Sequence, residues 1–167
     1  ANGRRHVPTE AILEAAAEPR TKIVTLSHVE FASGQRHDLA RIGEFCRQRG
    51  IYFCVDAIQS LGVLPVDVSA MNIDFLSADG HKWLLGPEGC GVMYIAQEWQ
   101  DRVEPVEFGW TNVAGYNDYA SRDMALRTDA GRYECGTLNT VGCFGLEASM
   151  KFLNDIEAAC PGGLARR

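Results

Sequence analysis

The sequence lacks the features that define several classes of protein. None of its six cysteines forms a C-x-x-C pair, so the spacing of a zinc site is absent. No apolar stretch approaches the length of a membrane span, and the N-terminal ANGRRHVPTE contains no apolar signal core. The net charge of −6 argues against binding to nucleic acid. We therefore expect no membrane or nucleic-acid partner and a cytoplasmic location.

Other absences concern metals, disulfides and the start of the chain. His28, His37 and His81 have no recognisable ligand spacing, so we expect no metal site. The cysteines are scattered, and we expect Cys46 and Cys54 to be small buried thiols in a reducing compartment rather than parts of a disulfide framework. The chain does not begin with Met, so we expect it to be part of a longer protein.

The chain is long enough, at 167 residues, for one domain with a hydrophobic core. Strand-like apolar runs alternate with amphipathic segments, which predicts an α/β fold with a mostly parallel sheet and flanking helices. The predicted helices are 8–17 with Thr9 as its N-cap, 37–50 with Asp38 and Gly50 at its ends, and 141–159. The predicted strands are Thr21–Val29, Ile51–Ala57, Ile73–Gly80 and Gly91–Ala96, and 99–133 is predicted to form loops.

The amount of predicted helix is small for a parallel sheet. The run Ile51–Ala57 is almost continuously apolar, as in a strand that is covered on both faces. The predicted helices are too few to cover both faces of four strands and their edges. We therefore expect further segments of the protein to pack on both sides of this chain.

Polar side chains follow two of the predicted strands, where each strand ends. The segment from Ile58 to Asn72 is long enough for a crossover, so the strands before and after it can be parallel neighbours about 5 Å apart. Their carboxyl ends then share one edge of the sheet, which is where ligands bind in open α/β folds. Asp56 and Lys82 lie at these ends, with Gln59, Asp79 and His81 nearby.

This combination of side chains suits pyridoxal 5′-phosphate (PLP). A Lys amine in a partly dry pocket becomes a nucleophile towards carbonyls. An acid opposite the pyridine nitrogen keeps that nitrogen protonated, and PLP needs both partners. Lys82 and Asp56 supply them; Gln59 could reach the ring hydroxyl, and His81 could donate to the phosphate.

The segments VDAIQS and GHKWLLGPEGCGVMYI resemble the class V aminotransferase family of fold-type I PLP enzymes. LSHVEFASGQRHDL and YECGTLN also resemble family segments, and the similarity extends over roughly 21–152. The resemblance implies that residues 1–167 are a partial PLP-binding large domain. It also implies that the N-terminal part of that domain and a C-terminal small domain lie outside this chain.

The resemblance implies a role for individual residues. Lys82 would form the Schiff base with PLP as the catalytic lysine, Asp56 would pair with the pyridine nitrogen, Gln59 with the ring oxygen and His81 with the phosphate. CGTLN matches a family loop that reaches the phosphate of a neighbouring subunit, so Thr137 is a candidate donor and a homodimer is expected. Trp110 is a candidate for the rim of the substrate site.

The chain departs from the family pattern at two positions. Asp79 stands where many relatives have a phosphate-binding Ser, and a carboxylate beside a phosphate is repelled. Phe31 stands where cysteine desulfurases often have an Asn that assists the cofactor hydroxyl, so Gln59 would act there alone.

Cys90 has no clear base among its sequence neighbours and is predicted not to be a catalytic nucleophile.

The resemblance favours an enzyme that acts on an amino acid, either cysteine desulfurase-like or isopenicillin N epimerase-like. The residues that would choose among desulfuration, elimination, epimerisation and transamination are expected outside this chain. The alternative is a non-catalytic relic of the fold that acts as a binding or structural subunit. The 167 residues alone are expected to be inactive and to hold PLP weakly.

Overall fold

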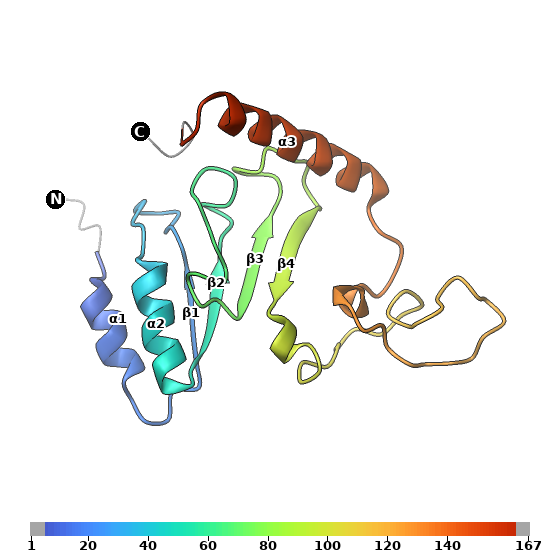
Figure 1. Ribbon diagram of the computed structural model, residues 1–167, viewed down its shortest axis with the longest axis horizontal. Coiled ribbons are helices and arrows are strands. Elements are labelled where there is room, and N and C mark those ends of the chain that lie inside the picture. Colours follow the sequence, from blue (N-terminus) through green and yellow to red (C-terminus); the bar gives the residue numbers. More distant parts are fainter. Residues whose placement is uncertain (1–5, 163–167) are drawn as a thin grey trace.

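The computed structural model describes residues 6–162, which form a four-stranded sheet with helices and a long irregular segment (Figure 1). The helices are α1 (Thr9–Ala16), α2 (Leu39–Arg49) and α3 (Thr140–Ala159), with short 3-10 helices η1 (Gln97–Trp99) and η2 (Ala130–Tyr133). The strands are β1 (Ile23–Ser27), β2 (Tyr52–Asp56), β3 (Phe75–Asp79) and β4 (Gly91–Ile95). Each predicted helix and strand is present, with ends that differ by one or two residues.

The strands lie in the order β1-β2-β3-β4. β1, β2 and β3 are parallel, and β4 returns antiparallel to β3 after the turn that contains Lys82. The predicted mostly parallel α/β sheet is therefore confirmed. In this register Ser27 lies beside Asp56, and Asp56 lies beside Ser77. Neighbouring residues in register point to the same face, so these three side chains share one side of the sheet.

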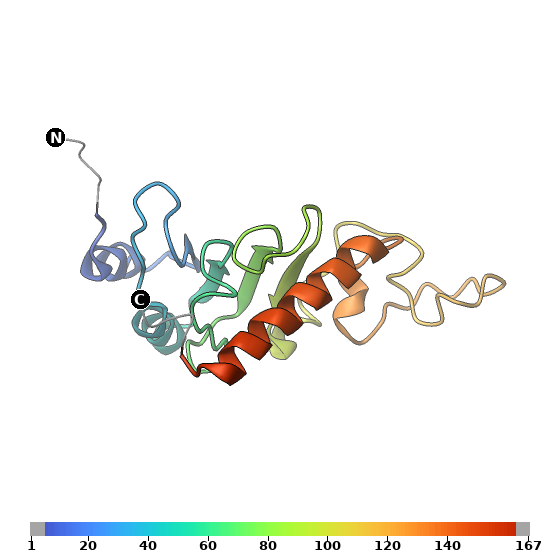
Figure 2. The same cartoon turned by 90° about the horizontal axis from the view of Figure 1, so that it is seen from above.

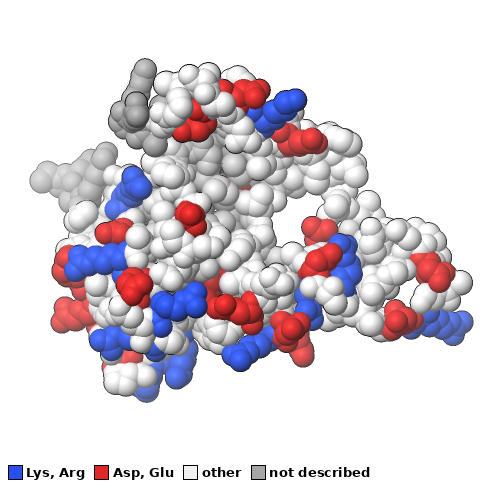
Figure 3. Space-filling view, in the orientation of Figure 1, with Lys and Arg blue, Asp and Glu red and all other residues white. Residues whose placement is uncertain are grey.

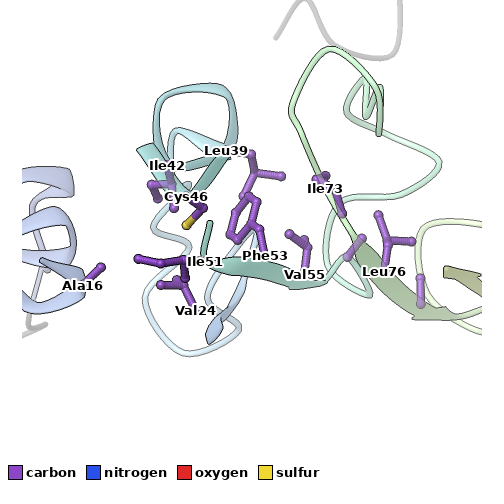
Figure 4. Close-up of a cluster of buried hydrophobic side chains, with 12 residues drawn as sticks. Ala16, Val24, Leu39, Ile42, Cys46, Ile51, Phe53, Val55, Ile73 and Leu76 are labelled. Atoms are coloured by element: carbon purple, nitrogen blue, oxygen red, sulfur yellow. The ribbon is translucent and has the colours of Figure 1, made fainter. Parts of the chain in front are cut away.

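The hydrophobic core lies between one face of the sheet and the helices. α2 packs on β2, and α1 packs against α2. The core side chains come from both helices and from β1, β2 and β3 (Figure 4), and they are Ala16, Val24, Leu39, Ile42, Cys46, Ile51, Phe53, Val55, Ala57, Ile73, Leu76 and Ala78. Burial of this apolar face is the main favourable contribution to the fold.

The two ends of α2 follow the predicted capping. The Asp38 carboxylate accepts a hydrogen bond from the Arg41 backbone N–H at 3.1 Å. Gly50 ends the helix with φ of +64°, a conformation that costs glycine little. The prediction for α1 was wrong in one respect: Pro8 is the N-cap, and Thr9 is already helical.

The opposite face of the sheet is largely uncovered by the described residues. Ile23 and Met93 are 52% and 55% exposed, although both are apolar strand residues. In β2, Phe53 and Val55 are buried, but Tyr52 and Cys54 are only half-buried. Cys54 is therefore not buried within this chain as expected, whereas Cys46 is. The uncovered face agrees with the expectation that the helices of this chain are too few to cover both faces of the sheet.

The segment between β4 and α3 is mostly irregular and extends beyond the sheet in both ribbon views (Figures 1 and 2). Buried polar contacts organise its base: the Asn112 side chain accepts from Gly109 N–H and donates to the carbonyl of Arg132 at 2.7 Å. α3 then crosses the upper edge of the sheet in Figure 1, above the ends of β3 and β4.

Within residues 6–162, no helix is long and apolar enough to cross a membrane. Acidic and basic side chains alternate over the face that Figure 3 shows, without a broad basic patch there.

Candidate active site

Asp56 ends β2 on the uncovered face of the sheet, and two groups hold its carboxylate. Oδ1 accepts a hydrogen bond from the backbone N–H of Ile58 at 2.9 Å. Oδ2 lies 3.4 Å from the hydroxyl of Ser27, which can donate to it from the neighbouring strand. The Asp56 carboxylate is half-buried, and these two contacts fix its orientation. A fixed orientation suits a group that binds a single atom of a ligand.

Lys82 lies in a closed turn that connects β3 to β4. Gly80 N–H donates to the carbonyl of Cys90, and Gly86 N–H donates to the carbonyl of Gly80, both at 2.8 Å. Leu85 N–H donates to the carbonyl of Lys82 at 3.0 Å, with Leu85 itself at a φ of +57°. These backbone hydrogen bonds fix the position of the Lys82 Cα. The Lys82 side chain itself is half-buried.

The loop after Asp56 packs directly against this lysine turn. Gly62 has a φ of +101°, and a Cβ added there would lie 2.3 Å from the carbonyl oxygen of Trp83. Only glycine permits so close a backbone approach. The loop that contains Gln59 and the turn that contains Lys82 are therefore in contact at the carboxyl-end edge of the sheet, as the sequence predicted for their backbones.

α3 packs against the lysine turn from outside the sheet. Cβ atoms built at Gly80 and Gly86 would lie 3.0 and 2.7 Å from Cδ1 of Leu146, so the Leu146 side chain of α3 lies directly against the turn. The Asn139 side chain caps α3 by accepting from Gly142 N–H at 3.0 Å, and it donates to the carbonyl of Gly89 at 3.2 Å. The position of the turn therefore depends on α3 as well as on β3.

An open cavity of ≈ 420 Å³ lies at this edge, beside Asp56. Its lining also includes Ile58, Ser77, Ala78, Asp79, Gly89, Cys90, Gly91, Val92 and Met93. Of the predicted site residues, Asp56 lines this cavity, whereas Gln59, His81 and Lys82 do not, although each is close in sequence to a lining residue. None of the described lining residues is Lys or Arg, so two carboxylates give the cavity a negative character.

The Asp79 carboxylate lies against the side chain of His81. Asp79 Oδ1 lies 3.2 Å from His81 Nδ1, a contact that is an ion pair only when the imidazole is protonated. The neighbouring His81 side chain is the main reason that the pKa of Asp79 is lowered. The contact joins the carboxylate at the position where relatives were expected to have Ser to the residue that was predicted to contact phosphate.

His28 follows β1 at the same edge and is only 1% exposed. Its backbone N–H donates to the carbonyl of Asp56 at 2.9 Å, but its ring Nδ1 has no partner among the described atoms. A histidine that follows a strand near this edge is expected from the sequence to be structural, with its hydrogen bonds satisfied, and this expectation is wrong for Nδ1. Burial, followed by the nearby Arg36, lowers the pKa of His28 to about 4, so the ring is neutral near pH 7.

The remaining candidates do not line the cavity. Thr137 is exposed in the segment before α3, and its predicted contact with a neighbouring subunit stays a prediction. Trp110 packs against Tyr116 and Tyr119, with ring centroids 5.9 and 6.2 Å apart, in the segment that extends beyond the sheet. Phe31 is 84% exposed, and its predicted consequence for Gln59 stays untested.

Sequence reasoning missed Ser27 and Gly62, which support the site without touching a ligand. Ser27 is the last residue of β1, beside the last residue of β2, so the predicted strand ends could have indicated it. Gly62 gave no signal of its own, because its role depends on the backbone of a distant turn.

Comparison with known proteins decides the family. The model of the family "Aminotransferase class-V" matches residues 2–160. The chain belongs to the class V aminotransferase family. The predicted family is thereby confirmed.

The relatives agree in sequence and in fold. A probable cysteine desulfurase of Methanothermobacter thermautotrophicus is 36% identical over 86% of this chain and 35% of its own length. The cystine C–S lyase C-DES, solved with its reaction product cysteine persulfide, has a TM-score of 0.80 and 29% identity over 90% of this chain and 40% of its own. A mutant of C-DES with glycine covalently linked to the PLP cofactor has a TM-score of 0.81 and 28% identity, with the same coverage of both chains. The chain spans about a third of the length of the curated relatives that it matches.

Proposed function

We propose that the protein containing this chain is a PLP-dependent enzyme that acts on a sulfur-containing amino acid, with Lys82 as the residue that binds the cofactor covalently. The observation that carries the proposal is the contact between the loop after Asp56 and the lysine turn at one edge of the sheet. Membership of the class V aminotransferase family and the similarity to cysteine desulfurases support it. The non-catalytic relic is not favoured, because the acid and the lysine are both present.

The residues at the edge fit the pyridine half of PLP. Asp56 presents a carboxylate whose two oxygens are already oriented by Ile58 N–H and the Ser27 hydroxyl. A carboxylate in this position holds a proton on the ring nitrogen, and Gln59 is the candidate partner of the ring oxygen. When bound, PLP supplies a protonated ring that withdraws electrons from the α-carbon of an amino acid.

Lys82 has two proposed tasks in this site. Its amine would hold the cofactor covalently, and once free it would move a proton at the substrate α-carbon as a general base and acid. The turn that carries Lys82 is anchored by Gly62 on one side and Leu146 on the other. Because these contacts hold the backbone of the turn in place, the Lys82 side chain can move from the cofactor to the substrate while its Cα stays fixed.

The phosphate half of PLP is less well supplied by this chain. The described lining of the cavity brings carboxylates and no Lys or Arg, and His81 is paired with Asp79. We therefore propose that phosphate donors come from residues outside this chain and from Thr137 of a second copy in a homodimer. For the same reason we propose that the 167 residues alone bind PLP weakly and are inactive.

Two reaction outcomes have support among the relatives. Desulfuration of cysteine is favoured by the cysteine desulfurases, and elimination from cystine by the similarity to C-DES. Epimerisation is the third proposed outcome, and only the sequence resemblance to isopenicillin N epimerase-like proteins supports it. We also propose a cytoplasmic location, which the free cysteines suit.

Product analysis tests the proposal on the natural polypeptide supplied with PLP. Cysteine should yield alanine and reducible sulfur if the enzyme is a desulfurase, whereas cystine should yield pyruvate, ammonia and cysteine persulfide if it is a lyase. Lys82→Ala should lower either rate by about 10³-fold, and Lys151→Ala, on exposed α3, is the matched control. A Lys82→Ala protein that keeps its rate, or a wild type that takes up no PLP, would refute the proposal.

A further inference from the structure

Two of the cysteines lie next to each other beside the candidate active site. Cys90 precedes β4, and Cys143 is in the first turn of α3. A Cβ built at Gly142 would lie 2.9 Å from Cβ of Cys90, so the backbone next to Cys143 is in direct contact with the Cys90 side chain. These residues are distant in sequence and are brought together by the packing of α3 on the lysine turn.

Both thiols face one open cavity of ≈ 440 Å³, whose lining also includes Glu147 and Lys151 of α3. Cys143 is exposed and Cys90 is half-buried. The cavity therefore gives a small molecule access to the pair. Cys90 also lines the separate cavity that contains Asp56 and Asp79, so a single side chain joins the two sites.

The geometry points to a dithiol redox site: we propose that Cys90 and Cys143 form a reversible disulfide by exchange with a low-molecular-weight disulfide. This bond would join the turn that follows Lys82 to the first turn of α3. Such a pair needs side chains that approach closely: the Cys90 side chain contacts the backbone next to Cys143, and the neighbouring Cys143 thiol contributes to the raised pKa of Cys90.

The exchange has two balanced steps. The thiolate of exposed Cys143 attacks one sulfur of the small disulfide, forms a mixed disulfide and releases one small thiolate. The thiolate of Cys90 then attacks Sγ of Cys143, which forms the intramolecular disulfide and releases the second small thiolate. Two protein thiols are oxidised, one small disulfide is reduced to two thiols, and the protons from the cysteines go to the released thiolates.

The order of the steps follows from the surroundings of the two sulfurs. Partial burial, and then the adjacent Cys143 thiol, raises the pKa of Cys90, so Cys90 is the poorer first nucleophile. The carboxylate of Asp79 adds to this rise, and Glu147 is the other acidic group that lines the shared cavity. The second step should therefore limit the reaction and become faster as pH rises.

Equilibration of the natural polypeptide with oxidised and reduced glutathione tests the inference, followed by thiol blocking and peptide mapping. We expect one dominant linked peptide that joins Cys90 to Cys143, loss of both free thiols, and full recovery after reduction. Cys143→Ser should abolish the linked peptide. Cys135→Ser and Cys160→Ser, which remove exposed cysteines elsewhere, should leave it unchanged.

Two results would overturn the inference. One is that glutathione stays attached to Cys143 as a mixed disulfide while Cys90 remains free. The other is that linked peptides involve Cys135 or Cys160 as often as Cys90. Because the wild-type protein alone gives both readouts, a variant that fails to fold does not affect the test, and no readout depends on enzyme activity.

Discussion

The two halves of this chain reach their structures in different ways. Residues 8–96 contain the sheet, α1 and α2, and nearly all of the buried apolar side chains, Phe53 and Ile42 among them. Residues 97–162 contribute only Leu146 and Leu153 to the buried apolar set, while Phe144 and Val141 of α3 are 73% and 81% exposed. The first half is held by its own core. In the second half, α3 is held by contacts to the lysine turn, and the segment before it by polar contacts such as those of Asn112. Asp56 therefore rests on a self-contained scaffold, whereas the position of Lys82 depends on both halves.

The largest effect should come from the core of the first half. Phe53 is fully buried, so Phe53→Ala should lower the free energy of unfolding by about 4 kcal/mol. The matched control is Phe144→Ala on exposed α3, which should change it by less than about 0.5 kcal/mol. Urea unfolding measures both, and equal losses would contradict the contrast between the two halves.

Gly62 tests the contact between the two site loops. Gly62→Ala introduces strain at a positive φ and a clash with the Trp83 carbonyl, so it should cost about 3 kcal/mol and displace the lysine turn. Gly34→Ala is the control, because it has a φ of +72° but no atom within 4 Å of the added Cβ, and it should cost about 1 kcal/mol. Thermal and urea unfolding give the values. The same cost for both variants would mean that the loops do not touch.

The elements with strong local signals could be predicted from the sequence, and those that depend on distant contacts could not. The apolar runs and the Asp38 and Gly50 caps located β2 and α2 to within a residue or two. The positions of Asp56 and Lys82 at one edge followed from the parallel strands. By contrast, the approach of the Gly62 backbone to the Trp83 carbonyl could not be predicted, because it depends on which atoms another part of the fold brings near. The uncovered face around Met93 agrees with the small amount of helix that the sequence predicts.

His28 makes the stability of the first half sensitive to acid. Its pKa is 6.5 when unfolded and about 4 when folded, so the unfolded chain binds more protons between these values. The free energy of unfolding should therefore fall by up to about 3 kcal/mol as pH is lowered through this window, and stay level above it for this group. Urea unfolding of His28→Asn should show a correspondingly smaller fall, with His6→Asn, at an exposed position, as the control. Identical pH profiles for wild type and His28→Asn would exclude this role.

The smallest effect should come from Ser27, which supports Asp56 through one long hydrogen bond. Ser27→Ala should cost about 1 kcal/mol in the free energy of unfolding. It should also weaken PLP retention in the natural polypeptide, because the Asp56 carboxylate loses one of its two orienting groups. Ser69→Ala, at an exposed site, provides the baseline. Unchanged cofactor retention would mean that Ile58 N–H alone orients the carboxylate.

Borohydride reduction of the PLP-loaded natural polypeptide, followed by peptide mapping, tests most directly whether Asp56 and Lys82 serve one cofactor. Reduction makes the bond between PLP and a lysine permanent, so the labelled peptide identifies that lysine. We predict that the label lies on Lys82 and that Asp56→Ala lowers its yield. A label on another lysine, or no label on a protein saturated with PLP, would contradict the account.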